Sequence, residues 1–412
     1  MMETVEIAVI GAGVIGLAIA HRLAGEGREV LLIDPEEPGS GASYGNAGTV
    51  ADYAVQPVGT PDVLKNLPSL LFDRNSPLSV RRAALPALAP WLMRFARQSL
   101  PGAARRNALV LAGLLADASD RWRDLAVEIG GAALLQDRGC LYWYQTDAAR
   151  RAAGADIAFR RDLGVKVEML SANELSALEP ALPVSGGGGA WFPGARFMTD
   201  PGGMVGLLAA AALRQGAVVR RARVRSLTRQ QGHVLLSGDG LSVRAARVIL
   251  AAGAHSRDLA RQAGDRVPLD TERGYHLEWD MDAPRLGRPV CPTARGIYLC
   301  PMSGRLRVAG TVELGGLAAP PSRHRLARLE DGARAIFPDL PAPDRSWMGF
   351  RPSMPDSLPV IGLSQAGPEV IHAFGHGHIG LTLAPATAAL VAGLVAGGDV
   401  DQRLAALRPG RF

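Results

Sequence analysis

The stretch IAVIGAGVIGLAIAHRLAGEGREVLLID, at residues 7–34, decides the fold of this chain. An apolar strand pattern leads into Gly11, Gly13 and Gly16, a helical pattern follows, and a second strand pattern ends at Asp34. In such a unit the first glycine permits a tight turn, the second lets the backbone approach a pyrophosphate, and the third lets helix and strand pack closely. The helix N-terminus attracts phosphate, and an acid 18 residues after Gly16 suits unphosphorylated ribose hydroxyls. The stretch predicts a dinucleotide-binding unit and disfavours NADP, but alone it does not separate FAD from NAD.

A second glycine loop near the other end of the chain separates the two cofactors. Residues 375–394, GHGHIGLTLAPATAALVAGL, form a glycine loop that runs directly into an apolar helix pattern. A nicotinamide enzyme needs only the first loop, whereas a flavin enzyme whose cofactor lies along both ends of a folded-back chain needs both. The N-terminus of this helix is expected to face the flavin N1/C2=O edge, where its positive end stabilises anionic reduced flavin. The two loops together predict non-covalently bound FAD.

Length, charge and cysteine content limit the number of domains and the partners and metals that the protein is expected to bind. At 412 residues the chain is too long for one typical core, so two domains are expected. The net charge is +6, but arginine is spread along the chain, and we expect no nucleic-acid partner, while a basic patch for anionic lipid or RNA stays open. Cys140, Cys291 and Cys300 show no metal-ligand spacing, so we expect reduced core cysteines and no metal.

The ends of the chain bear on its location. The first strand begins by Ile7 without a basic segment or cleavage site before it, so no secretory leader is expected. The apolar stretch 379–398 contains Pro385 and many small residues, which favours a buried helix over a membrane span. We expect a cytoplasmic protein and leave open a peripheral position on the inner face of the plasma membrane.

The alternation of patterns predicts an α/β fold. A Rossmann-like FAD-binding domain is expected from residues 1–60, 147–270 and 350–412, and a substrate domain built on an antiparallel sheet from 61–146 and 271–349. Within these segments we expect one helix over 147–164, a helix-capping pattern from Ser171 to Glu174, and one strand over 217–227. The two domains are therefore discontinuous in sequence.

Six motifs along the chain belong together: GAGVIG at 11–16 with Asp34, GASYGNAG at 41–48, VILAAGAHS at 248–256, GYHLEW at 274–279, GFRPSMPDSLPVIG at 349–362 and the final loop at 375–394. Through them essentially the whole chain resembles the D-amino-acid oxidase and dehydrogenase superfamily of flavoproteins. The superfamily includes glycine oxidase and sarcosine oxidase. The GNAG loop and the RPSMPDSLPVIG segment are most similar to the bacterial D-amino-acid dehydrogenases, including the D-hydroxyproline dehydrogenases.

The patterns and the resemblance together give the residues expected to hold FAD. The resemblance implies that the 43–48 loop runs along the isoalloxazine and that the backbone of Val224 reaches the adenine. The expected FAD-binding residues are Gly11, Gly13, Val14, Ile15, Gly16, Asp34, Pro35, Ser43, Asn46, Ala47, Gly48, Val224, Ala252, Gly253, Gly375, Gly377, His378, Ile379, Gly380, Leu381 and Thr382.

Arg351 is the main candidate for substrate binding, because the resemblance places it at the family's carboxylate-binding arginine. A planar guanidinium holds a carboxylate bidentately, where lysine acts as a point charge. Tyr53, His276, Tyr298 and His378 are weaker candidates for the same pocket. Strand alternation puts Tyr275 and His276 on opposite faces, so at most one of the two points inward.

The expected reaction is FAD-dependent dehydrogenation of D-amino or cyclic imino acids, with cis-4-hydroxy-D-proline as one candidate substrate. Hydride passes from Cα to flavin N5, and the imine becomes a 2-oxo acid or stays as a cyclic imine. A quinone or another electron carrier is the expected acceptor. In glycine-oxidase-like members an arginine follows the proline of the YxxP strand, but here Met302 does, which disfavours a glycine or sarcosine specialist.

Three alternatives stay open from the sequence alone. The first is an oxygen-using amine oxidase of the glycine or sarcosine type, and the second is a flavin domain that acts on modified tRNA. The third is an electron-relay subunit of a larger complex.

Overall fold

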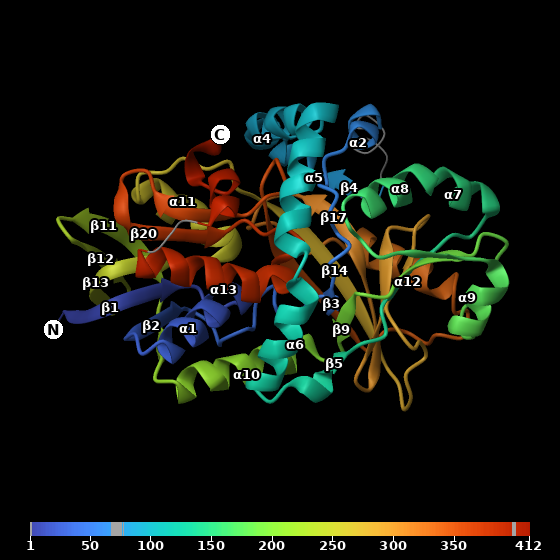
Figure 1. Cartoon of the computed structure of the whole chain (residues 1–412), viewed down its shortest axis with the longest axis horizontal. Helices are drawn as coiled ribbons and strands as arrows, with labels where there is room; N and C mark the ends of the chain where they lie inside the picture. The colour runs from blue at the N-terminus through green and yellow to red at the C-terminus, as the bar shows by residue number, and fades with distance from the viewer. Residues whose placement is uncertain (1, 67–75, 77, 398–400) are drawn as a thin grey trace.

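A computed structural model describes residues 2–66, 76, 78–397 and 401–412. Two large sheets lie side by side, with helices between and around them (Figure 1). The eight-stranded sheet contains the N-terminal strand, and the nine-stranded sheet contains most of the strands from the second half of the chain. This arrangement confirms the predicted α/β fold with a second, largely antiparallel unit.

The eight-stranded sheet is parallel at its centre, as the βαβ pattern requires. Its path is β10-β2-β1-β13-β12-β11, with β20 paired to β13 and β19 paired to β20. Helices α1, α10 and α13 cover one face of this sheet, and α11 packs near the other. The strands are β1 (Glu3–Ile10), β2 (Val30–Asp34), β10 (Val218–Arg221), β11 (Val224–Gln230), β12 (His233–Gly238), β13 (Leu241–Leu250), β19 (Val360–Ser364) and β20 (Gly367–Phe374).

The nine-stranded sheet has the path β18-β14-β17-β16-β15-β6-β8-β7, and β4 pairs with β17. Helix α12 packs on one face through Tyr275, Leu277 and Trp279, and the other face is turned toward the layer that contains the eight-stranded sheet (Figure 1). The strands are β4 (Leu78–Val80), β6 (Cys140–Trp143), β7 (Glu168–Leu170), β8 (Gly189–Phe192), β14 (Asp270–Asp280), β15 (Val290–Pro292), β16 (Ile297–Met302), β17 (Arg305–Leu314) and β18 (Arg345–Ser353).

A three-stranded sheet, β3-β9-β5, lies between the two large sheets, and it consists of β3 (Thr49–Val50), β5 (Leu135–Gln136) and β9 (Arg196–Met198). The helices are α1 (Val14–Gly25), α2 (Pro61–Lys65), α4 (Leu85–Gln98), α5 (Pro101–Leu115), α6 (Ala118–Glu128), α7 (Asp147–Ala152), α8 (Gly154–Asp162), α9 (Ala172–Leu178), α10 (Pro201–Arg214), α11 (Ser256–Gln262), α12 (Arg323–Arg334) and α13 (Gly380–Ala396). Short 3-10 turns are η1 (Arg82–Ala84), η2 (Ala132–Leu134), η3 (Gly253–His255), η4 (Gln402–Ala406) and η5 (Pro409–Arg411).

Two local predictions are confirmed in detail. Ser171 accepts a hydrogen bond from the backbone of Glu174, whose carboxylate accepts one from the backbone of Ser171, so α9 begins with a capping box. The apolar stretch near the C-terminus forms α13, which is buried along most of its length. In the described part of the chain, no helix has the length and apolarity needed to cross a bilayer.

Three predicted boundaries differ from the structure. The single helix expected over 147–164 is two helices, α7 and α8, which meet at Ala153. The single strand expected over 217–227 is β10 and β11, because the chain leaves one edge of the sheet and joins the other. Strands β7 and β8 lie in the segment 147–270 assigned to the FAD unit, yet they extend the nine-stranded sheet, because β8 pairs antiparallel with β6.

Candidate active site

The first glycine loop joins β1 to α1, and its three glycines differ in backbone conformation and in the space available for a side chain. Gly11 has a φ of 109°, and a Cβ on it would lie well inside van der Waals contact with the Ala251 carbonyl. A Cβ on Gly16 would overlap the Gly11 carbonyl in the same way. Gly13 differs, because its φ is −73° and a Cβ would touch only Ser43 Oγ, at 3.5 Å, among the described atoms. The fold itself does not require a glycine at position 13, which leaves space over the N-terminus of α1.

Asp34 lies at the end of β2, beside this loop. Its carboxylate accepts hydrogen bonds from the backbone N–H of Ala12, at 2.7 Å, and from that of Glu36, at 2.9 Å, which follows Pro35. The Ala222 N–H donates to the Asp34 carbonyl at 3.0 Å, two residues before Val224, where β11 begins. The expected ribose and adenine contacts therefore come from neighbouring segments.

The second glycine loop leads from β20 into α13. Gly375 and Gly377 both have positive φ values, 83° and 55°, so the backbone here favours glycine. In the described structure no side chain caps Ile379, and the first turn of α13, which begins at Gly380, carries no acid. The first N–H groups of α13 are consequently available to an electron-rich ligand.

Leu381 and Thr382 hold this helix end in place. The Leu381 carbonyl accepts from the Trp122 indole at 2.7 Å, and Thr382 Oγ1 accepts from the Ala51 N–H at 3.1 Å. Helices α1 and α13 pack side by side, and both begin near the middle of the molecule, next to the nine-stranded sheet (Figure 1). Two positive helix ends therefore point toward the same region.

The GNAG loop connects this region to the nine-stranded sheet. Ser43 Oγ accepts from the Val14 N–H at 2.9 Å, and Asn46 Oδ1 accepts from the Gly48 N–H at 2.8 Å across Ala47. Arg307 of β17 donates to the carbonyls of Tyr44 and Asn46. The loop is thus fixed at both ends before any ligand binds.

These residues fit FAD on geometric grounds. A Cβ at Gly253 would meet no described heavy atom within 4 Å, and one at Gly377 would only reach Ser353 Oγ, at 4.0 Å. Together with Gly13 and Ala252, these glycines leave space above the backbone near the N-termini of α1 and α13 and near the carboxylate of Asp34, although one N–H of the α1 terminus, that of Val14, is already bound by Ser43. A dinucleotide that ends in a flavin needs this combination of backbone access, positive helix ends and a ribose-binding acid.

Arg351 lies on β18, opposite Glu272 of β14, and its guanidinium occupies space above Gly274. A Cβ on Gly274 would come within 2.7 Å of Arg351 Nη1, so only glycine leaves room for the guanidinium. Arg351 donates one hydrogen bond to the Thr311 carbonyl at 3.3 Å, and no described carboxylate lies within 4 Å of it. Burial lowers the pKa of Arg351, partly offset by the charge of Glu272. This guanidinium therefore keeps most of its donors for a ligand.

Thr311, which receives that hydrogen bond, has a φ of 56° within β17. A β-branched residue in the left-handed region is strained, and such strain is concentrated at functional sites. The strain lies beside a shift in register between β14 and β17, and it turns the Thr311 carbonyl toward Arg351.

The predicted histidines divide into two roles. His378 is exposed, yet the surrounding protein, and then the charge of Arg351, lower its pKa to about 4. The Gly377 N–H donates to the Pro352 carbonyl at 2.7 Å, so the backbones of His378 and Arg351 lie in adjoining segments. His276 is buried, lies 3.2 Å from the Gly45 carbonyl through Nδ1, and stacks on Trp347. Burial and then the charge of Arg307 lower the pKa of His276 to about 4. His276 thus supports the GNAG loop, while Tyr275 points to the opposite face and donates to Glu313, as alternation predicts.

The predicted tyrosines lie together on the inner face of the nine-stranded sheet. Tyr298 is half-buried and donates to the Tyr142 hydroxyl at 3.4 Å, and it is separated from His276 across the sheet only by Ala309. Tyr53 is 1% exposed, and its hydroxyl donates to Cys140 Sγ at 3.1 Å. Burial raises the pKa of Tyr53 and of Tyr298, so both stay protonated. Tyr53 stacks on Phe192 in an aromatic core, and the half-buried Tyr298 packs against the same core.

Four residues with a clear part in this site were not among the predicted ones. Gly274 makes room for Arg351, Thr311 binds it, and Arg307 with Glu278 holds the GNAG loop. The glycine inside the GYHLEW strand was the only available signal, since a glycine in a strand interior marks close approach of another group. Met302, which follows the proline of β16, lies beside the GNAG loop, where its Cε is 3.4 Å from a Cβ built on Gly48.

Comparison with known proteins agrees with this geometry. A D-amino-acid oxidase from Bradyrhizobium diazoefficiens is 36% identical over 432 residues, with complete coverage of both chains. D-amino acid dehydrogenase 2 from Ralstonia nicotianae is 31% identical, covering 95% of this chain and 96% of its own. The crystal structure of glycine oxidase from Geobacillus kaustophilus superposes with a TM-score of 0.78 at 25% identity over the whole of both chains.

The family model described as FAD dependent oxidoreductase, DAO, matches residues 6–394, which includes both glycine loops, the GNAG loop and Arg351. The cofactor that fits the open region is therefore FAD, and the chain is an oxidoreductase that belongs to the DAO family of FAD-dependent enzymes.

Proposed function

We propose that this enzyme dehydrogenates D-amino acids or cyclic imino acids at Cα. The observation that carries the proposal is the guanidinium of Arg351, which has no ion-pair partner among the described residues and lies over Gly274, on the strand whose end meets the glycine loop before α13. An amino-acid carboxylate is the ligand that such a guanidinium binds bidentately. The names of the curated relatives, D-amino-acid oxidase and D-amino acid dehydrogenase, support the D configuration.

The residues of the chain position the substrate rather than react with it. Arg351 holds the carboxylate, which fixes the direction of the Cα–H bond. His378 is neutral above pH 4, so it does not repel the substrate amine, and an unprotonated ring nitrogen accepts a hydrogen bond from the amine N–H. Tyr298 donates from its protonated hydroxyl, and Tyr53 supports the tyrosine cluster behind it.

FAD, when bound, supplies the acceptor for the Cα hydride. The free N–H groups of α13 and the backbone of the GNAG loop hold it, and Asp34 with the α1 N-terminus holds its ribose and pyrophosphate. The imine product is then hydrolysed to a 2-oxo acid when it is acyclic. A cyclic substrate such as cis-4-hydroxy-D-proline leaves a cyclic imine. We infer this type of cyclic substrate from the resemblance of the GNAG and RPSMPDSLPVIG segments.

The first test is anaerobic bleaching of the holoenzyme by a panel of D- and L-amino acids, proline analogues, glycine and sarcosine. We expect rapid loss of the oxidised flavin absorbance with D-substrates and little change with L-substrates. The fastest substrate then defines the preferred side chain. A holoenzyme that stays oxidised with the whole panel would refute the amino-acid assignment.

The electron acceptor is a separate proposal. We propose that a quinone or another electron carrier reoxidises the flavin. We also propose that the enzyme is cytoplasmic and lies peripherally on the inner face of the plasma membrane. The free, buried thiols of Cys140 and Cys300 suit a reducing compartment. The alternative is oxygen, since one curated relative is named an oxidase. To decide between the two acceptors, the holoenzyme is reduced anaerobically and then mixed with oxygen or with a soluble quinone, and the rate of flavin reoxidation is measured. The proposal fails if oxygen reoxidises the flavin faster than the quinone does.

A further inference from the structure

The positive charge of this chain is concentrated in one stretch. Arginine is spread along the whole sequence, but the acids that balance it are not. Residues 74–116 contain seven arginines and no aspartate or glutamate. The net charge of the chain is +6 and this stretch alone carries +7, so all other residues together are net −1. The stretch includes α4 and α5.

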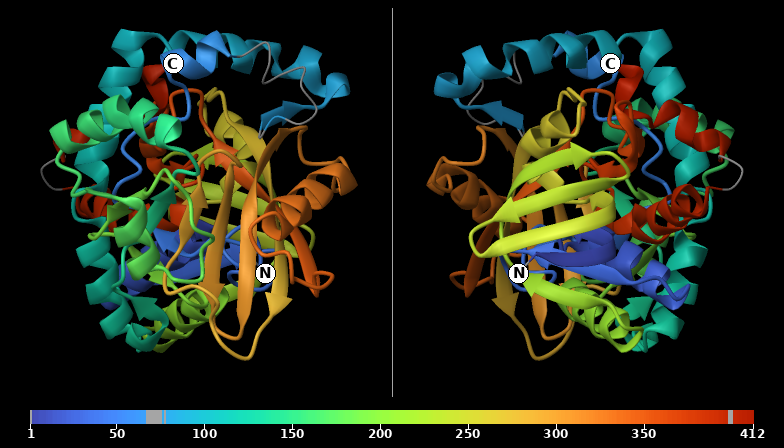
Figure 2. Two further views of the ribbon diagram at one scale, coloured as in Figure 1. Left: turned by 90° about the vertical axis from the view of Figure 1, so that its right-hand side faces the viewer. Right: turned by 90° about the vertical axis from the view of Figure 1, so that its left-hand side faces the viewer.

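Helix α4 lies across one end of the molecule with one face outward. In both views of Figure 2 it runs along the top, next to α2, and α5 descends from it (Figure 1). Leu88, Trp91 and Phe95 are buried and pack toward β4 and β17. The opposite side of α4 exposes Pro90, Met93, Arg94 and Arg97, at the spacing of a single helix face.

Large apolar side chains protrude from this end of the molecule. Met93 is 68% exposed, Leu100 at the turn between α4 and α5 is 49% exposed, and Leu109 on α5 is 54% exposed. Isolated apolar residues on a surface are ordinary, but these three accompany a dense positive charge. The combination of exposed apolar and arginine side chains on one helical surface is typical of helices that lie in the lipid interface.

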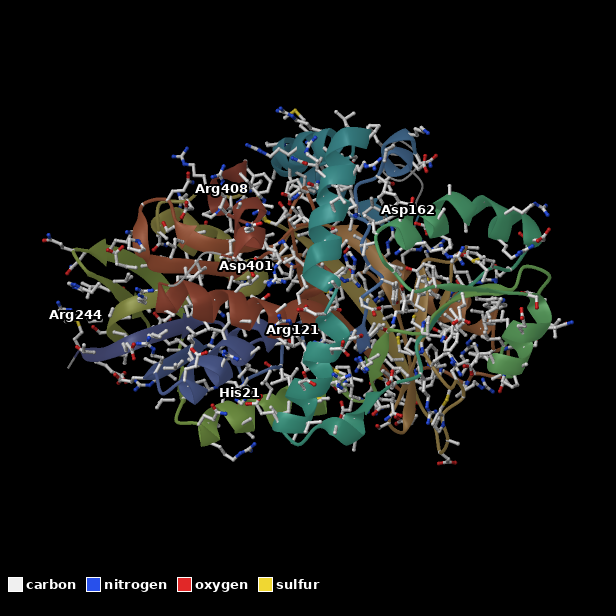
Figure 3. The ribbon with its side chains drawn as sticks, viewed as in Figure 1. His21, Arg121, Asp162, Arg244, Asp401 and Arg408 are labelled. Atoms are coloured by element: carbon white, nitrogen blue, oxygen red, sulfur yellow. The ribbon has the colours of Figure 1, made fainter. Side chains whose placement is uncertain are left out.

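The arginines on this surface carry uncompensated charge. Arg94, Arg97, Arg105 and Arg106 are exposed, and within the described residues none of them lies within 4 Å of a carboxylate. Exposed arginines elsewhere do have such partners: Arg22 pairs with Glu26, Arg123 with Asp120, and Arg225 with Asp239. Arg408, labelled in Figure 3, lies on the same upper side of the molecule and is also exposed.

We propose that the outer faces of α4 and of the first half of α5 bind the surface of an anionic phospholipid bilayer. Lipid phosphates pair with the four arginines, and Met93, Leu100 and Leu109 enter the region between headgroups and acyl chains. A second copy of this chain fits less well, because it would place the same uncompensated charges against each other. Nucleic acid fits less well because the protruding side chains are aliphatic, with no aromatic ring among the three to stack on a base.

This surface lies next to the proposed active site. The Trp91 indole on the buried side of α4 donates to the Ser353 carbonyl at 3.3 Å, two residues after Arg351 on β18. A bilayer bound to α4 would bring a lipid-soluble electron acceptor to the side of the molecule that carries the substrate-binding strand. Delivery of an electron acceptor from the bilayer rests on the proposed function, but the binding of lipid itself does not require turnover.

The experiment is co-sedimentation of the holoenzyme with vesicles of phosphatidylcholine, prepared with or without phosphatidylglycerol. We expect binding only to the vesicles that contain phosphatidylglycerol, and weaker binding as salt rises. One surface arginine contributes about 1 kcal/mol, or roughly fivefold in partitioning, so Arg94→Gln, Arg97→Gln, Arg105→Gln and Arg106→Gln together should weaken binding by several hundredfold. Met93→Ser with Leu109→Ser should weaken it as well, without any change in charge.

A matched control removes the same charge elsewhere. Arg22→Gln, Arg123→Gln, Arg221→Gln and Arg225→Gln change four exposed, carboxylate-paired arginines, and this variant should retain lipid binding. The flavin absorbance spectrum and turnover with a soluble dye verify that each variant is folded. Equal binding of the two fourfold variants would overturn the proposal, and so would equal binding of the native enzyme to neutral and anionic vesicles. If the native enzyme forms a concentration-dependent dimer that the fourfold variant of Arg94, Arg97, Arg105 and Arg106 abolishes, the outer surface of α4 and α5 would instead bind a second copy of the chain.

The outcomes also distinguish this inference from the proposed function. Flavin bleaching by D-amino acids without vesicle binding would refute only the lipid surface. Vesicle binding by an enzyme that no amino acid bleaches would refute only the proposed substrate.

Discussion

Arg351 illustrates how a single residue acquires its role from what surrounds it. The chain has many arginines, and most of those that are buried have a carboxylate partner, as Arg273 has Glu313 and Arg307 has Glu278. Arg351 instead lies over the bare backbone of Gly274, and its one described protein acceptor is the carbonyl of Thr311. A partly buried cation that lacks an ion-pair partner is costly, so a carboxylate bound here, as proposed, would relieve part of that cost and gain affinity from it.

The first prediction concerns the charge of Arg351. Arg351→Met should lower kcat/KM by about 100- to 1000-fold, because two charge-assisted hydrogen bonds and the fixed orientation of the substrate are lost together. FAD content should not change, since the expected FAD contacts are with other residues. Steady-state dye reduction with the best D-substrate measures the effect. Arg214→Met, at the exposed end of α10, is the control, and equal rates for the two variants would contradict the assigned role.

The second prediction concerns Gly274. Gly274→Ala should lower kcat/KM by about 10- to 100-fold while Arg351 is still present, because the new methyl group occupies the space of the guanidinium. The flavin spectrum should stay native. Gly206→Ala, where no described atom lies within 4 Å of the added Cβ, serves as the control. Unchanged activity in Gly274→Ala would mean that the position of Arg351 above the glycine is not needed for turnover.

At the scale of elements, the turn from β1 into α1 separates what the fold needs from what the cofactor needs. Gly16→Ala should prevent stable folding, because its Cβ would overlap the Gly11 carbonyl where α1 packs on β1. Gly13→Ala should fold, because the protein offers only an ordinary contact of 3.5 Å with Ser43 Oγ, but it should bind FAD at least tenfold more weakly. Circular dichroism of the apoproteins and titration with FAD measure the two effects. A Gly13→Ala variant that binds FAD normally would show that no ligand approaches this backbone.

The same contrast explains what could be predicted from the sequence. The glycine loops, the acid at Asp34 and the burial of α13 depend on local spacing and periodicity, which a sequence displays directly. The position of Gly274 under Arg351 depends on the pairing of β14 with β18, and the hydrogen bonds from Arg307 to the GNAG loop join residues about 260 positions apart. No local pattern encodes such pairings. The break between α7 and α8 was missed because a helical pattern continues across Ala153, although Gly154 begins the second helix.

At the scale of the whole molecule, a charge cluster joins the nine-stranded sheet to the GNAG loop. Glu278 on β14 is 1% exposed and accepts hydrogen bonds from Arg305, Arg307 and Arg345. Arg307 in turn donates to the carbonyls of Tyr44 and Asn46 in the GNAG loop of the cofactor unit. The two discontinuous units, whose exact boundaries remain a prediction, are therefore linked by a buried carboxylate that also orders the expected flavin-binding loop.

This cluster predicts a specific loss of stability in acid. The arginines around Glu278 outweigh the opposing effect of its burial and lower its pKa to about 2, from about 4.5 in the unfolded chain. Because the folded-state pKa is depressed, the stabilisation is complete above pH 4.5 and is lost as the pH falls toward 2, and it amounts to roughly 3 kcal/mol. His276 acts in the same direction at higher pH, since its pKa is lowered from 6.5 to about 4 and the unfolded chain takes up the proton first. Stability should therefore fall in two overlapping stages between pH 6.5 and pH 2.

Glu278→Gln tests the lower stage, because it keeps the shape of the side chain and removes the charge. The variant leaves Arg307 buried without its counter-charge, so the free energy of unfolding at pH 7 should fall by about 3–5 kcal/mol, and FAD should dissociate more readily as the GNAG loop loosens. Between pH 4.5 and pH 2 its stability should depend less on pH than that of the native enzyme, while the stage from pH 6.5 to pH 4 persists. Urea unfolding of the apoprotein across this range measures both effects. Asp239→Asn, which removes the carboxylate from the exposed pair with Arg225, is the control and should follow the native profile. If Glu278→Gln also follows the native profile, the ion pairs of Glu278 do not account for the loss of stability in acid.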